Sequence, residues 1–147
     1  GKAVRFAEED VRPMGREARG VRGMMLDPAQ SVISMLVAKG EEQSVLTATE
    51  NGFGKRTAIA EYTRHGRGTK GMIAIQTSDR NGKLIGAVLV SDTDELMLIS
   101  TGGVLIRTLV QDIREMGRST QGVTLINLDD GTKLAGMEKI IETDEEQ

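Results

Sequence analysis

Hydrophobic residues along this chain gather in short runs that are separated by turn-forming pairs. The runs are rich in Val, Ile, Leu and Thr, and pairs such as Asn51-Gly52, Asn81-Gly82 and Asp130-Gly131 divide them. Runs of about five to seven such residues between turn signals are typical of β-strands. The pattern predicts strands over residues 2–6, 20–26, 31–38, 43–49, 54–60, 71–76, 83–90, 95–100, 104–110, 122–127 and 134–140. Helical periodicity is weak: residues 110–116 predict a short turn of helix, whereas the matching residues 60–65 do not.

The sequence repeats itself every 51 residues. Four classes of position recur in one ungapped register: Gly1, Gly52 and Gly103; Arg5, Arg56 and Arg107; Arg16, Arg67 and Arg118; Gly20, Gly71 and Gly122. A repeat with about four strands is typical of a propeller blade, which must stack on neighbouring blades to bury its faces. The sequence therefore predicts an all-β, propeller-like array of about three four-stranded blades, of which the last is incomplete.

This organisation predicts a single domain over residues 1–141, with repeats at about 1–51, 52–102 and 103–141. Residues 142–147 form an acidic tail that we expect to be disordered. At 147 residues the chain is long enough for one hydrophobic core.

Composition excludes several classes of site. The chain has no cysteine, so it has no disulfide framework and no thiolate metal site. Its single histidine, His65, cannot by itself build a His-rich metal site or a Ser-His-Asp triad. No apolar run approaches the roughly 20 residues of a membrane span. Aromatic residues make up 2% of the chain, which argues against modules that bind RNA or single strands by stacking bases on aromatic rings.

The net charge of −3 hides an uneven distribution. Residues 1–23, 52–71 and 103–122 hold 14 of the 19 Lys and Arg residues but seven of the 22 acidic ones, a net charge of +7 against −10 elsewhere. Arg residues on surface strands also protect sheet edges from aggregation. An excess at equivalent positions of each repeat instead indicates a basic stripe for a polyanion. The candidate contacts are Arg5, Arg16, Arg19, Arg22, Lys55, Arg56, Arg64, Arg67, Lys70, Arg107 and Arg118.

The turn motifs indicate a family. Gly66-Arg-Gly-Thr-Lys-Gly71 and Gly117-Arg-Ser-Thr-Gln-Gly122, with Asn51-Gly-Phe-Gly-Lys-Arg56 and Ala58-Ile-Ala-Glu-Tyr62, make the chain resemble the C-terminal domain of the bacterial DNA gyrase A subunit. The resemblance implies a β-pinwheel, a ring of four-stranded blades that exchange strands, of which this chain corresponds to the C-terminal half. The family's Gln-Arg-Arg-Gly-Gly-Lys-Gly box belongs to the first blade and does not occur here; residues 65–71 are a degenerate counterpart.

The resemblance also implies a function. In that family a basic rim bends and wraps duplex DNA, so that the whole enzyme supercoils DNA with ATP in the bacterial cytoplasm, at the nucleoid. The implied partners are the rest of the A subunit, the B subunit of the enzyme and duplex DNA, with no membrane and no small-molecule substrate. We expect no catalysis, cofactor or metal in this chain itself: Tyr62, its one tyrosine, lies in a strand pattern, and no phosphate-binding Gly-Lys-Ser/Thr loop occurs.

Two alternatives stay open at this point. The C-terminal domain of the topoisomerase IV A subunit shares the blade and has a degraded or missing box. A protein-binding propeller would use the same basic rim for an acidic protein partner. The turn at Asp92 and Asp94 has some features of a Ca²⁺ loop, but its spacing and ligand count favour a solvated hairpin turn.

Overall fold

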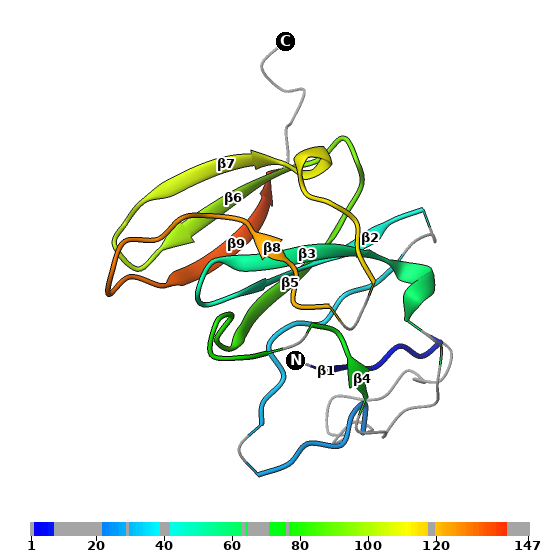
Figure 1. Cartoon of the computed structure of the whole chain (residues 1–147). Helices are drawn as coiled ribbons and strands as arrows, with labels where there is room; N and C mark the ends of the chain where they lie inside the picture. The colour runs from blue at the N-terminus through cyan, green and yellow to red at the C-terminus, as the bar shows by residue number, and fades with distance from the viewer. Residues whose placement is uncertain are drawn as a thin grey trace, which may run out of the picture.

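The computed structural model describes residues 2–7, 22–28, 30–38, 42–62, 64, 71–75, 77–117 and 120–140. Their regular structure is almost entirely β-strand, which confirms the all-β prediction (Figure 1). The strands are β1 (Lys2–Ala3), β2 (Ser44–Thr49), β3 (Phe53–Ala58), β4 (Met72–Ile73), β5 (Leu84–Val90), β6 (Glu95–Ser100), β7 (Leu105–Leu109), β8 (Val123–Thr124) and β9 (Leu134–Ile140). Two 3₁₀ turns follow β3 and β7: η2 (Ile59–Glu61) and η3 (Val110–Asp112).

The strands form three antiparallel sheets that follow one another through the molecule (Figure 1). The complete sheet has the order β5-β2-β3-β8, the next has the order β7-β6-β9, and β1 pairs with β4. Each sheet combines strands from different repeats: the complete one takes β2 from the first repeat, β3 and β5 from the second and β8 from the third. The blades therefore exchange strands, as the resemblance implied.

The 51-residue period of the sequence recurs in the pairing of β1 with β4 and of β3 with β8. In the β1–β4 pair Lys2 lies opposite Ile73, and in the β3–β8 pair Phe53 lies opposite Thr124. Both members of the second pair are 51 residues after those of the first. Repeated sequence positions therefore occupy repeated positions in space.

The hydrophobic core lies between the two larger sheets. Leu46 and Ala48 of β2 and Leu96 and Leu98 of β6 are completely buried, because every second side chain of each strand faces the neighbouring sheet. They form two clusters, one with Val90, Val110 and Ile113 and one with Ile126 and Leu134. Both clusters join residues of different blades, so neither sheet buries its face alone.

Most predicted strands occur, with shorter bounds at β1, β4 and β8. The prediction of a strand over 31–38 is wrong: these residues are exposed and form no strand. β5 pairs with β2 and β9 with β6, each of which belongs to the repeat before. Residues 31–38 lie in the first repeat and join none of the sheets formed by the described residues. The described part of 20–26 likewise forms no strand.

The two 3₁₀ turns test the helix prediction. The turn η3 confirms the short helical turn predicted from residue 110 onward. The expectation that residues 60–65 form no helical turn is wrong, since η2 covers Ile59–Glu61. Each turn buries one apolar side chain, Ile59 or Val110, and closes with one backbone hydrogen bond from the amide three residues later. One buried residue leaves too short a pattern to predict a helix from periodicity.

Candidate nucleic-acid interface

The predicted basic stripe divides into three groups in the structure. Arg16, Arg19, Arg67, Lys70 and Arg118 lie outside the described residues, as does the acidic tail. Arg22, Arg64 and Arg107 are exposed. Arg5, Lys55 and Arg56 are instead partly or fully buried at the junctions between repeats.

Arg5 and Arg56 make the same contact one repeat apart. A guanidinium nitrogen of Arg5 donates to the carbonyl oxygens of Ile59 and Tyr62, each at 3.1 Å. Nε of Arg56 donates to the carbonyl oxygen of Ile113 at 2.7 Å, and Ile113 is 51 residues after Tyr62. The arginine of one repeat therefore binds the main chain at the 3₁₀ turn of the next.

The third copy of this arginine is in a different environment. The side chain of Arg56 is 11% exposed and also forms an ion pair with Asp92, whereas that of Arg107 is 52% exposed and pairs with Glu95. Arg107 therefore keeps most of its surface accessible to a ligand.

Lys55 is completely buried, which does not suit direct contact with a phosphate in solution. Its Nζ donates to the carbonyl oxygens of Gly117 at 2.7 Å and Thr120 at 3.0 Å, and to the hydroxyl of Thr120 at 3.1 Å. The positions one repeat away are Val4 and Ile106. A comparison of the three repeats therefore indicates that this position is apolar and faces inward. Counting basic residues alone does not use this information.

The glycines that close two of the repeated turns lie at equivalent sheet edges. Gly71 and Gly122 end the turns 66–71 and 117–122 and lead directly into β4 and β8, each at the edge of its sheet. Both have positive φ, +87° and +81°, and a Cβ would lie 2.6 Å from the Ala3 oxygen and 2.4 Å from the Gly54 oxygen. Only glycine allows this backbone conformation and this close approach. The repeat therefore places the closing glycines of both turns alike.

Arg80 is a residue that the sequence pattern did not single out, because it lies outside the three basic segments. Its guanidinium lies 4.1 Å from the centroid of the Phe53 ring and donates to the Gly122 oxygen at 3.2 Å. It is exposed and next to the third repeat's turn. The one sequence signal near Arg80 is the Asn81-Gly82 turn that follows it, and this signal does not predict a contact with the third repeat.

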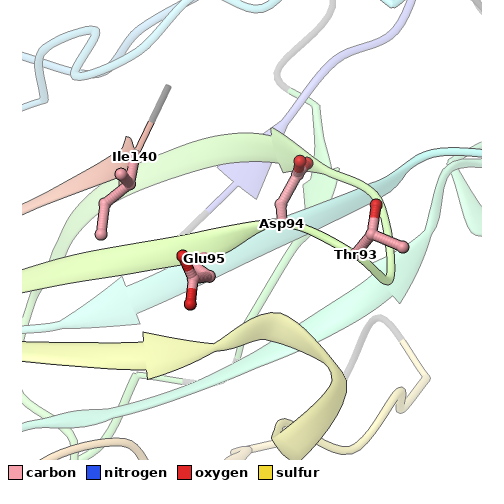
Figure 2. A pocket seen from close by; sticks show the side chains of 4 residues that line it. All are labelled: Thr93, Asp94, Glu95 and Ile140. Atoms are coloured by element: carbon pink, nitrogen blue, oxygen red, sulfur yellow. The ribbon is translucent and has the colours of Figure 1, made fainter. Parts of the chain in front are cut away.

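The acidic turn between β5 and β6 borders a hollow of about 230 Å³ lined by Thr93, Asp94, Glu95 and Ile140 (Figure 2). Asp94 accepts from the Ser91 amide at 2.8 Å and lies 3.8 Å from the Lys139 ammonium, while Glu95 pairs with Arg107. These carboxylates are engaged by cations of the protein. The described residues contain no group of three potential metal ligands. They also contain no helix long and apolar enough to cross a membrane.

Comparison with known proteins shows the family. The model of the DNA gyrase C-terminal domain, described as a β-propeller, matches residues 1–39, 43–91 and 94–140. The chain belongs to the DNA gyrase C-terminal domain family. It is 53% identical to the DNA gyrase A subunit of Pseudomonas aeruginosa over 97% of its length, and 46% identical to that of Escherichia coli strain K12 over its whole length. It spans 15% and 17% of these two relatives.

Solved structures of this family have the same fold. A DNA gyrase A C-terminal domain superposes with a TM-score of 0.86 at 30% identity, over 96% of this chain and 48% of that one. The C-terminal domain of a DNA topoisomerase IV superposes with a TM-score of 0.88 at 25% identity, over 95% of this chain and 44% of that one. Both related structures are thus about twice as long as this gyrase-family chain.

Proposed function

We propose that this chain binds and bends duplex DNA through its basic turns, as part of a DNA gyrase A subunit. The observation that carries the proposal is the basic turn that recurs every 51 residues in the sequence, and whose closing glycine leads into an equivalent edge strand in two repeats. Membership of the DNA gyrase C-terminal domain family supports it. A row of such turns presents regularly spaced cations to a regularly spaced row of phosphates.

We infer a smaller set of direct DNA contacts than the basic residues of the sequence offer. Arg22, Arg64 and Arg107 are exposed and remain candidates, together with the arginines and lysines of the turns. Arg5, Lys55 and Arg56 act indirectly, because their donors are bound to main-chain oxygens of the neighbouring repeat. Arginines and turn amides suit phosphate oxygens, and the scarcity of aromatic rings favours backbone contact over base readout.

The proposed role in the enzyme follows from bending. Bending a DNA site costs several kcal/mol, and phosphate contacts distributed along a curved edge offset this cost. The catalytic tyrosine and the ATP site would be supplied by the rest of the A subunit together with the B subunit. The proposed setting is the bacterial cytoplasm, at the nucleoid. The alternative is the corresponding domain of topoisomerase IV, which the structural similarity also supports.

A salt titration tests DNA binding. The affinity for a short linear duplex should fall steeply as the salt concentration rises. The logarithm of the binding constant should fall linearly with the logarithm of the salt concentration, with a slope of about −0.9 for each phosphate contact. Arg67→Glu with Lys70→Glu should weaken binding more than Lys133→Glu with Lys139→Glu, a control with the same change of charge. Equal losses would place the site elsewhere, and absence of binding at low salt would favour the protein-binding alternative.

A further inference from the structure

Two junctions between repeats have an equivalent pair of residues at the edge of a sheet. In the β1–β4 pair Lys2 lies opposite Ile73, and in the β3–β8 pair Phe53 lies opposite Thr124. Lys2 and Phe53 are 51 residues apart, as are Ile73 and Thr124. The first junction therefore has an exposed lysine at the position where the second junction has an aromatic ring.

A cation from another part of the chain covers this ring. The guanidinium of Arg80, in the connection between β4 and β5, lies 4.1 Å from the centroid of the Phe53 ring. Its Nη2 also donates to the carbonyl oxygen of Gly122, next to β8, at 3.2 Å. The second junction thus has its own exposed cation beside the edge pair, and Arg80 supplies it in place of a lysine on the strand.

The main chain that carries Arg80 is anchored on both sides. Nδ2 of Asn51 donates to the carbonyl oxygens of Asp79 and Arg80 at 3.2 and 3.0 Å. Nδ2 of Asn81, a residue that is 0% exposed, donates to the Gln121 oxygen at 2.8 Å. The guanidinium is therefore held at the junction by its own turn as well as by the ring.

The arginine and the ring occur together in one repeat. The residues one repeat before and after Arg80 are Ala29 and Gly131, and the residue one repeat after Phe53 is Val104. The repeat with lysine on the strand has alanine in the turn, and the repeat with phenylalanine on the strand has arginine in the turn. Each of these two repeats therefore keeps one cation, although from different positions in the sequence.

We propose that Arg80 binds a phosphate of the DNA duplex at the second junction, as Lys2 does at the first. This inference rests on the proposed function. A guanidinium has N–H groups along more than one edge, so one edge can bind the Gly122 oxygen while another binds phosphate oxygens. Stacking on the ring covers a face of the group and leaves its charge in place. Holding the side chain in advance also reduces the entropy lost on binding.

Removal of the charge tests this. Arg80→Gln keeps a side chain that can donate to the Gly122 oxygen but removes the cation, and Lys2→Gln makes the same change of charge at the first junction. Each variant should weaken binding to a short linear duplex by roughly tenfold and lower the salt slope by about one phosphate contact. Lys139→Gln, on β9, removes the same charge elsewhere and should leave the salt slope unchanged.

A transfer of the first junction's residues to the second separates DNA binding from stability. The double variant Phe53→Lys with Arg80→Ala copies Lys2 and Ala29 of the first repeat. It removes both the stacking on the ring and the bond to Gly122, but it returns one cation to the edge pair. Its salt slope should therefore match that of the wild type and its affinity should exceed that of Arg80→Gln, although its melting temperature should be lower.

The outcomes are distinguishable. An Arg80→Gln variant with a lower melting temperature but unchanged affinity and salt slope would overturn the proposal, because Arg80 would then only join the two repeats. A folded transfer variant that binds DNA no better than Arg80→Gln would overturn it as well. If the wild-type chain shows no salt-dependent binding, the proposed function itself fails.

Discussion

At the scale of single residues, the same arginine has different roles in different repeats. Arg5 and Arg56 are bound to main-chain carbonyl oxygens of the following repeat, whereas Arg107 is half exposed and pairs with Glu95. The chemistry of the side chain is identical in all three places. What differs is the packing around it: the Arg56 side chain is 11% exposed and that of Arg107 is 52% exposed, so the role follows from packing and not from residue type.

This difference predicts unequal effects of one substitution. Arg56→Met leaves the buried Ile113 oxygen without its donor and should destabilise the fold by about 1–3 kcal/mol. The lost ion pair adds little, since Asp92 is 80% exposed and becomes solvated. Arg107→Met removes an exposed pair and should cost at most about 1 kcal/mol. Urea unfolding of both variants measures this, and equal costs would contradict the junction role of Arg56.

At the scale of elements, the Gly-bounded turn depends on close approach between chain segments. Gly122→Ala should be strongly destabilising, because its Cβ would lie 2.4 Å from the Gly54 oxygen in addition to the positive φ. Gly103 has a similar φ of +83° but nothing within 4 Å of its Cβ. Gly103→Ala should therefore cost only the conformational term, about 1–2 kcal/mol. Thermal unfolding of the two variants separates the cost of the Cβ contact from the cost of positive φ. An equal loss of stability in both variants would show that the contact with the Gly54 oxygen has no effect.

The sequence predicted elements better than it predicted contacts. Strand runs such as 95–100 and 134–140 occur with the expected bounds, because alternation and turn signals are local properties. Residues 31–38 have an equally good strand pattern and form no strand, because pairing needs a partner that local sequence does not reveal. Lys55 is a candidate DNA contact by sequence but buried in the structure for the same reason: its burial depends on a turn 62 residues away.

At the scale of the whole molecule, the blades depend on one another. Strands are exchanged between repeats, the core clusters join two sheets, and side chains of one repeat hold the turn of the next. Junctions of this kind fix how successive sheets sit against one another. A rigid row of basic turns can impose its curvature on a bound duplex. A flexible row of turns would instead adapt to the shape of a straight duplex.

This rigidity leads to a prediction about the shape of the DNA. If the row of turns bends the duplex, the protein should bind a small DNA circle more tightly than a linear duplex of the same sequence, because the circle is already bent. Smooth bending of a short site costs about 1–6 kcal/mol, so the preference should be at least about fivefold. Competition between the two forms at one salt concentration measures it. Equal affinity would contradict bending and leave binding alone, whereas a change in linking number after ligation of nicked circles would show that the bend has a handedness.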